Sequence, residues 1–267
     1  MNEQHSKWET NELVQTFLEG VRGAIPGASF QLEVLSKIVN MWCPLPSRIL
    51  DLGCGDGILG RMLLDAHAEA HVIFADISDP MLEASKKKIG DNPRATVVKA
   101  DFATPDWVDG FEVETPFDVI VSGFAIHHQS DDRKKELYAE IYGLLCEGGV
   151  FLNLEHVSSA TPSGSELFDS FFVDHLRRFH SNVSPGKSTR EIEEAYYQDK
   201  KDNILAPVET QCQWLRDIGF QDVDCFFKVF ELALFGGRKH PTSACSGSRK
   251  RPAPADARVR QFSKKRR

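Results

Sequence analysis

Three short apolar runs in the first half of the chain each carry an aspartate close to their end. "RILDL" holds Asp51 just ahead of the stretch "GCGDG", and "HVIFADI" and "TVVKADF" carry Asp76 and Asp101. Apolar runs that alternate with amphipathic segments predict the strands of a parallel sheet. Open parallel sheets bind ligands at the carboxyl edge of their strands. These carboxylates therefore predict a site for a ligand with hydroxyl, amine or cationic groups.

The glycine stretch that begins at Gly53 distinguishes two ligand classes. A dinucleotide-binding loop has the spacing G-x-G-x-x-G, and here Ile58 stands in the place of its third glycine. Asp51 would repel a pyrophosphate, whereas it would attract the amino group and sulfonium of S-adenosylmethionine (SAM). Asp76 is placed to accept hydrogen bonds from ribose hydroxyls, and Asp101 from an adenine amine. The residues therefore favour SAM.

Four motifs occur in order between Ser47 and Val157 and resemble those of class I SAM-dependent methyltransferases. They are "ILDLGCGDG", "FADIS", "KADF" and "FDVIVSGFAIHH". The resemblance implies that SAM is the cofactor and that the backbone of Gly53 to Gly55 holds its methionine part. The cofactor-binding residues that it implies are Asp51, Gly53, Cys54, Gly55, Asp76, Ile77, Met81, Asp101, Phe102, Ser122 and Gly123.

Several of these residues have a second interpretation. Aspartates at strand ends also cap helices, and Met81 in "DPMLEA" suits core packing as well as a place beside the adenine. The resemblance implies that Asp51 reaches the amine of SAM through water. It also implies that Phe102 or Ile77 packs on the adenine ring.

The order of the elements predicts an α/β fold with a doubly wound, seven-stranded, mostly parallel sheet. Two final apolar runs follow one another so closely that they predict a hairpin, with the last strand antiparallel to its neighbour. The resemblance implies the same Rossmann-like methyltransferase fold. The strands are expected at 48–52, 70–77, 95–101, 117–125, 150–157, 222–228 and 230–239, and a helix at 131–149 is expected to end at a glycine pair.

Composition divides the chain into three parts. Residues 1–46 predict a helical lid over the cofactor, with helices at 11–22 and 28–41 on either side of the breaker "IPG". Residues 47–239 form the SAM-binding domain, with a helical insertion at about 160–203. Residues 240–267 are rich in Pro, Ser, Gly and charge and predict a disordered basic tail.

The segment after the fourth strand bears on the methyl acceptor. It reads "SGFAIHH". This segment lacks the Asn/Asp-Pro-Pro-Tyr pattern of N6-adenine and glutamine methyltransferases and the Pro-Cys pattern of cytosine-C5 enzymes. It also lacks the paired glutamates of protein-arginine enzymes. Ser122 is not a metal ligand of the catechol-enzyme kind, and the six cysteines include no CxxC pair, so no metal site is expected. The candidate catalytic residues are histidines that can act as bases near neutral pH, namely His127, His128 and, beside Glu155, His156.

The leading hypothesis is methyl transfer from SAM to a hydroxyl, amine or carbon of a small molecule. The region after the fifth strand also resembles the carboxymethyl-SAM synthase group of the tRNA wobble-uridine pathway, which implies a homodimer. In that group an arginine is expected where this chain has Lys200 or Lys201. Two further hypotheses are an RNA methyltransferase that uses the basic tail and a non-catalytic, methyltransferase-like binding protein.

Charge is divided unevenly along the chain. The formal net charge is -7, but residues 249–267 carry nine Lys/Arg against Asp256 alone. Nucleic acid is therefore expected to bind only through the tail. The polar N-terminus and the lack of an eighteen-residue apolar run predict a cytoplasmic protein that does not contact membranes. The basic clusters of the tail also resemble a nuclear import signal, which would place a eukaryotic chain in the nucleus.

Overall fold

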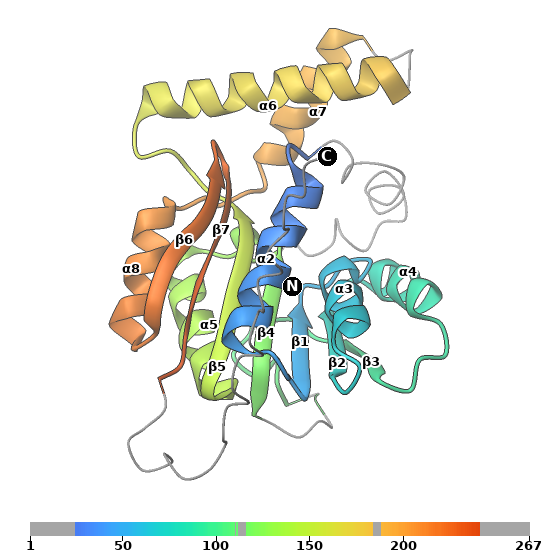
Figure 1. The fold of residues 1–267 in the computed structure, drawn as a ribbon. Helices are drawn as coiled ribbons and strands as arrows, with labels where there is room; N and C mark the ends of the chain where they lie inside the picture. The colour runs from blue at the N-terminus through green and yellow to red at the C-terminus, as the bar shows by residue number, and fades with distance from the viewer. Residues whose placement is uncertain (1–24, 110, 112–115, 184–187, 241–267) are drawn as a thin grey trace, which may run out of the picture.

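The computed structural model describes residues 25–109, 111, 116–183 and 188–240 (Figure 1). The predicted helix at 11–22, most of the predicted lid and nearly all of the basic tail lie outside these residues. Within the described part of the chain, no helix is long and apolar enough to cross a membrane.

One sheet of seven strands organises the molecule, in the order β3-β2-β1-β4-β5-β7-β6. Strands β1 to β5 pair in parallel, and β7 runs antiparallel to both β5 and β6. This arrangement confirms the predicted fold class and the terminal hairpin. The bounds are β1 Arg48–Leu52, β2 His71–Asp76, β3 Ala95–Lys99, β4 Phe117–Gly123, β5 Leu145–His156, β6 Gln221–Val229 and β7 Leu232–Arg238.

Helices cover both faces of the sheet because the strands are apolar on both. In β1, Leu50 and Leu52 join one hydrophobic cluster with α5 (Asp131–Leu144) and α8 (Val208–Ile218). Ile49 joins the other cluster with α2 (Ala28–Trp42) and α3 (Ile58–Ala66). Period-two alternation sends successive side chains to opposite faces. The helices are α2 Ala28–Trp42, α3 Ile58–Ala66, α4 Asp79–Ile89, α5 Asp131–Leu144, α6 Pro162–Val183, α7 Thr189–Lys200 and α8 Val208–Ile218, with a short 3-10 helix, η2, at Ile126–His128.

The predicted end of the helix at 131–149 is wrong. Instead of running to the glycine pair, α5 ends at Leu144, and β5 begins at Leu145. Lys239 supports this earlier end, because its ammonium donates to the carbonyls of Tyr142 (2.9 Å) and Leu145 (2.8 Å). A cation that bonds the last carbonyls of a helix stabilises that end. Gly148 therefore lies within β5, with a φ of 79°.

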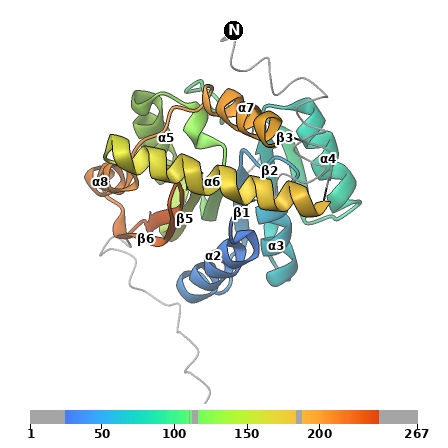
Figure 2. The ribbon, with the colours of Figure 1, turned by 90° about the horizontal axis from the view of Figure 1, so that it is seen from above.

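Helices α6 and α7 occupy the predicted insertion and lie across the carboxyl ends of the strands (Figures 1 and 2). Phe172 and Val173 of α6 and Tyr196 of α7 pack in a small cluster with Leu232, at the start of β7. Ser188 begins α7 with a capping box. Its hydroxyl accepts from the amide of Glu191, and the carboxylate of Glu191 accepts from the amide of Ser188. The insertion is thus anchored directly above the edge where parallel sheets bind ligands.

Glycine 60 offers a test of how tightly α3 packs on the sheet. A Cβ at Gly60 would lie 2.4 Å from the Phe74 ring and 2.9 Å from the Asp51 carboxylate. We expect Gly60→Ala to destabilise the protein by about 1–3 kcal/mol, because an overpacked core must shift. Gly143→Ala on α5 is the control, since nothing lies within 4 Å of the added methyl. Urea unfolding measures both, and equal stability of the two variants would contradict this packing.

Candidate active site

The glycine-rich loop between β1 and α3 leaves one side of its backbone uncovered. Gly53, Gly55 and Gly57 all have positive φ, at 66°, 54° and 81°, a region that L side chains rarely occupy. A Cβ at Gly53 would lie 2.3 Å from Cβ of Ala125, whereas one at Gly55 would meet nothing within 4 Å. The loop therefore packs closely at Gly53 and leaves room beside Gly55 for a ligand.

Asp76 links this loop to the start of α4. Its carboxylate accepts from the amide of Gly55 (2.8 Å) and from the amide of Ser78 (2.9 Å). Burial raises the pKa of Asp76, although the hydrogen bonds from these amides lower it in part. Carboxylate oxygens accept more than one hydrogen bond each. Asp76 can thus hold the loop and still accept from ribose hydroxyls.

Asp51 has a structural role in the described chain. The helix α3 begins after Gly57, which has no side chain to cap it. The buried carboxylate of Asp51 instead accepts from the amide of Gly60, at 2.7 Å. This is the capping interpretation considered from the sequence. The contact between Asp51 and the amine of SAM stays a prediction.

The loop after β3 is fixed by a side chain that the motifs did not reveal. Arg133 of α5 donates to the carbonyls of Phe102 (2.9 Å) and Thr104 (3.2 Å), and it forms a two-point ion pair with Glu140. Phe102 is buried, and its ring lies 3.4 Å from the Cβ position of Gly53. Asp101 accepts from the amide of Ala103 (3.0 Å). Arg133 thus holds the segment predicted to contact adenine.

The other predicted cofactor residues lie at the same edge of the sheet, at the ends of β1, β2 and β4 and in the first turn of α4. The hydroxyl of Ser122 donates to the carbonyl of Leu52 at 2.7 Å, which ties β4 to β1. Gly123 packs on Leu59, 2.8 Å from its Cβ position. The side chains of Cys54 and Met81 are buried, and Ile77 is half-buried. Cys54 lies in the cluster beneath α3, so its backbone is the part that can meet a ligand.

Two histidines beside this edge are each paired with a buried glutamate. Nδ1 of His127 lies 2.5 Å from Glu155, which also accepts from the His127 amide at 3.0 Å. Nδ1 of His156 lies 2.9 Å from Glu231. The two rings are 5.4 Å apart and nearly perpendicular. The structure thus brings together two of the three predicted catalytic histidines, each held by a carboxylate.

The third histidine, His128, is held by the backbone of the insertion. Its Nδ1 lies 3.4 Å from the carbonyl of Asp202, and its ring is 4.0 Å from the ring of His127. The amide of Ile204 donates to the carbonyl of His127 at 2.9 Å. The segment after α7 therefore packs directly against η2.

In each histidine–glutamate pair, the pKa of one member is shifted toward its charged form. Burial raises the pKa of Glu155, but the charge and hydrogen bond of His127 outweigh that effect, and its pKa is lowered. Burial lowers the pKa of His156, but the hydrogen bond and the charge of Glu231 outweigh burial. The pKa of His156 is therefore raised. Glu231 also accepts from the hydroxyl of Tyr196 at 3.0 Å. His156 therefore favours the cationic form more than an ordinary histidine does.

Comparison with known proteins places this geometry in a family. The model of a methyltransferase domain matches residues 50–151. Carboxy-S-adenosyl-L-methionine synthase of Idiomarina loihiensis is 22% identical over 242 residues, which cover 83% of this chain and 88% of that protein. Malonyl-[acyl-carrier protein] O-methyltransferase 1 of Ilyobacter polytropus is 33% identical over 101 residues, 38% of this chain and 35% of that protein.

A solved structure shows the same fold. Human N-acetylserotonin methyltransferase, in complex with SAM, superposes with a TM-score of 0.57 at 15% identity. The superposition covers 87% of this chain but only 57% of the human chain. Residues 50–151 thus match a methyltransferase domain, and the fold is that of class I SAM-dependent methyltransferases.

SAM is the cofactor, and the described residues fit it. The uncovered backbone at Gly55 and the carboxylate of Asp76 lie side by side at the carboxyl edge. Sequence reasoning missed Arg133 and Glu231 because the loop carbonyls that Arg133 bonds and the histidine that Glu231 bonds lie 29 to 75 residues away. One signal was present for Glu231, a lone carboxylate inside the apolar run "FELALF".

The contacts of Arg133 lead to a test of the adenine segment. We expect Arg133→Met to weaken SAM binding about tenfold, because two loop carbonyls lose charge-assisted hydrogen bonds, each worth roughly 1.5–3 kcal/mol. Lys135→Met is the control, since Lys135 is exposed on the same helix and pairs with Asp132. Calorimetric titration with SAM measures both variants. Equal affinities for SAM would show that Arg133 does not support the cofactor site.

Proposed function

We propose that this methyltransferase transfers the methyl group of SAM to a hydroxyl, amine or carbon of a small molecule, with His127 as the general base. The observation that carries the proposal is the pairing of His127 with the buried Glu155, next to the end of β4. SAM supplies an electrophilic methyl group, which an acceptor lone pair attacks in line as the sulfur leaves. The protein must then orient the acceptor and remove its proton.

The hydrogen bonds of His127 suit a base. Glu155 accepts from Nδ1–H of His127, which leaves Nε2 as the ring nitrogen that can exchange a proton with an acceptor. Glu155 also accepts from the amide of His127, so two bonds to one carboxylate fix the ring. The side chains of both residues are buried, with 6% and 1% exposed. Such a fixed orientation is what proton transfer requires.

The two other histidines suit supporting roles. Because Glu231 raises the pKa of His156, that ring keeps its proton over a wider pH range and suits a cationic role. A cation at this position stabilises negative charge that develops on an acceptor oxygen. Nδ1 of His128 lies 3.4 Å from a backbone carbonyl, a longer contact than those that hold the other two rings. We assign His128 to the wall of the site.

A carboxymethyl-SAM synthase is the second candidate, because the similarity to that group covers 83% of the chain. A basic side chain would have to meet the additional carboxylate. Lys200 pairs with Asp169, and Lys201 is exposed and bonds Gln198. Neither lysine is placed beside the glycine loop by any contact of the described residues, so the geometry gives methyl transfer more support.

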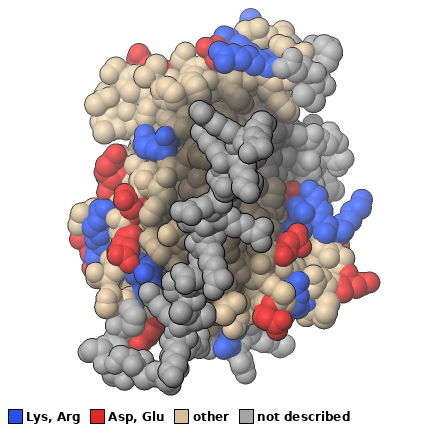
Figure 3. All heavy atoms as spheres, viewed as in Figure 1, with Lys and Arg blue, Asp and Glu red and all other residues tan. Residues whose placement is uncertain are grey.

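Binding by the basic tail to RNA remains a separate proposal, since nearly all of the tail lies outside the described residues. On the face viewed in Figure 3, acidic and basic side chains of the described residues are interspersed. Such a face has no single-sign field to attract nucleic acid. This face therefore gives no support to a nucleic-acid acceptor.

The experiment combines cofactor binding with transfer of label. We expect micromolar SAM binding by the full chain, lost in Asp76→Ala, and transfer of labelled methyl to a component of a small-molecule extract. His127→Asn should lower the transfer rate about 100-fold or more, the usual contribution of a general base, while SAM affinity is retained. His71→Asn is the matched control, because His71 lies at the amino end of β2.

Three outcomes would contradict the proposal. Absence of SAM binding would remove its basis. Label that appears in a modified SAM nucleoside, with none in another small molecule, would favour the carboxymethyl-SAM synthase. An unchanged rate in His127→Asn would exclude His127 as the base.

A further inference from the structure

The ring of His156 packs between two phenyl rings at the carboxyl edge of the sheet. Its centre lies 5.0 Å from that of Phe124, which follows β4, and 5.7 Å from that of Phe172 of α6. Phenyl rings offer no hydrogen bond that could fix which way the imidazole faces. Glu231, in the turn between β6 and β7, bonds Nδ1 of His156 at 2.9 Å. The orientation of the imidazole therefore depends on this carboxylate.

We propose that Tyr196 of α7 is a positioning residue for methyl transfer. Its hydroxyl holds the Glu231 carboxylate, and that carboxylate holds His156 in the orientation and charge that the reaction uses. The inference rests on the proposed function, because it explains how the cation assigned to His156 is maintained. It gives the insertion a part in the reaction as well as in covering the site.

The hydroxyl of Tyr196 lies between two carboxylates. It is 2.9 Å from Oδ1 of Asp169 and 3.0 Å from Oε2 of Glu231. A hydroxyl carries one proton, so it donates to one ionised carboxylate at a time. Burial, together with the charges of Glu231 and Asp169, raises the pKa of Tyr196, and the hydroxyl keeps this proton. The two carboxylates therefore compete for a single donor.

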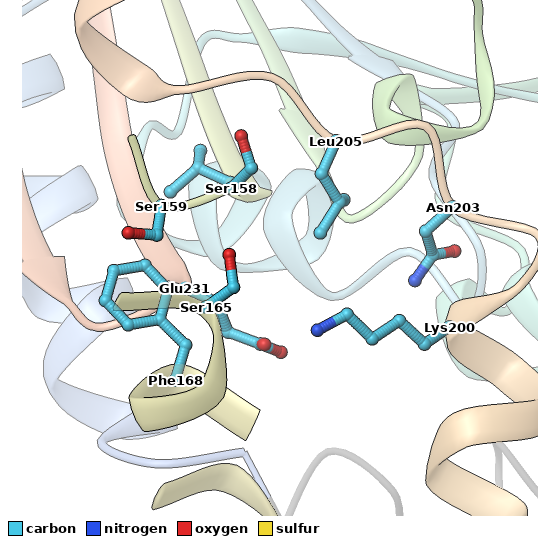
Figure 4. A pocket seen from close by; sticks show the side chains of 9 residues that line it. Ser158, Ser159, Ser165, Phe168, Lys200, Asn203, Leu205 and Glu231 are labelled. Atoms are coloured by element: carbon cyan, nitrogen blue, oxygen red, sulfur yellow. The ribbon is translucent and has the colours of Figure 1, made fainter. Parts of the chain in front are cut away.

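Lys200 decides this competition. Its ammonium bonds the same oxygen of Asp169 that faces Tyr196, and such an ion pair satisfies Asp169 without the hydroxyl. Glu231 is also the more buried of the two, with 5% of its side chain exposed against 17% for Asp169, so it needs the donor more. Figure 4 shows Lys200 and Glu231, the end members of this hydrogen-bonded group, turned toward one another. The proton of Tyr196 therefore goes to Glu231.

This donation fixes the Glu231 carboxylate from its far side. One oxygen of Glu231 accepts from Tyr196, and the other faces Nδ1 of His156. A carboxylate held at both oxygens cannot rotate without breaking one of these bonds. Tyr196 thus acts on the reaction through Glu231, with no contact to substrate required.

Groups on four elements face His156 and set its charge. Burial lowers the pKa of His156, but the hydrogen bond and charge of Glu231 raise it, and the carboxylates of Glu155 on β5 and Asp199 on α7 add to this rise. The ring of His127 on η2 lies 5.4 Å away, and a proton on it opposes the cation of His156. Glu231 bonds the ring nitrogen directly, so its charge outweighs those of the other carboxylates.

NMR of the full chain, labelled with 15N in its histidines and bound to S-adenosylhomocysteine, tests the proposal. The signals of His156 are identified by their absence in His156→Asn. We expect Glu231→Gln to lower the pKa of His156, because a neutral amide replaces the charge. The Nδ1 proton should exchange with water about tenfold faster or more, since the bond that is lost is one to a charged group.

The variant Tyr196→Phe removes the hydroxyl alone. It should speed the same exchange about threefold or more, and its effect should not add to that of Glu231→Gln in the double variant. Such a cycle separates an effect that passes through Glu231 from a loss of packing. Tyr197→Phe is the matched control, since this neighbouring tyrosine is exposed.

Lys200→Met tests the competition for the proton. It should reproduce the effect of Tyr196→Phe, because Asp169 then draws the hydroxyl proton away from Glu231. Lys201→Met is the control, since Lys201 is exposed and bonds Gln198. If Tyr196→Phe does not fold, Lys200→Met carries the same test, because its side chain is 27% exposed and its loss disturbs the packing less.

The variants should also change methyl transfer to the small-molecule extract. The cation of His156 is present below its pKa and is lost as the pH rises through it. Glu231→Gln lowers that pKa, so transfer should fall at a lower pH than in the intact chain. Tyr196→Phe should lower the rate about threefold to tenfold, with SAM affinity unchanged.

Two results would overturn the assignment. One is a pKa and an exchange rate of His156 that Glu231→Gln leaves unchanged. The other is an effect of Tyr196→Phe that is absent, or that adds in full to the effect of Glu231→Gln, as a loss of packing would. Both are read from the complex with S-adenosylhomocysteine and do not depend on transfer. Failure of the intact chain to transfer any methyl group would instead overturn the proposed function.

Discussion

A carboxylate that leaves water loses several kcal/mol of hydration free energy unless hydrogen bonds or a positive charge replace it. Four carboxylates at the carboxyl edge of this sheet are almost fully buried, with 1% to 9% exposed. Each must therefore have a fixed partner, and those partners define the site. The pairs are Asp51 with Gly60, Asp76 with Gly55 and Ser78, Glu155 with His127, and Glu231 with His156 and Tyr196.

The kinds of partner divide the edge into two halves. Asp51 and Asp76 are met by backbone amides, which do not titrate, so this half has a constant set of donors and acceptors. Glu155 and Glu231 are met by imidazoles, whose ring nitrogens can exchange protons. The first half suits a ligand held in one orientation, and the second suits a reaction that moves a proton. The insertion covers the second half, because Tyr196 of α7 bonds the same Glu231 that holds His156.

The fold was predictable because its signals are local or periodic. The strand "RILDL" occupies the predicted residues as β1, and the short link before Leu232 predicted the antiparallel hairpin. Contacts between distant segments were not predictable. Lys239, far along the chain, bonds the last carbonyls of α5, and Arg133 reaches back to the loop after β3. In the site, the order of the motifs indicated the strand ends, but it could not indicate the hydrogen bond from the Gly60 amide to Asp51.

The central claim is that the cofactor lies between the amide-held and histidine-held carboxylates of one sheet edge. A crystal structure of the full chain with S-adenosylhomocysteine tests it most directly. The account predicts density above β1, β2 and β4, with the ribose hydroxyls on Asp76, the adenine beside Phe102, and the sulfur on the side of the site that faces His127. Density for the nucleoside at any other surface, or a ribose that makes no contact with Asp76, would contradict it.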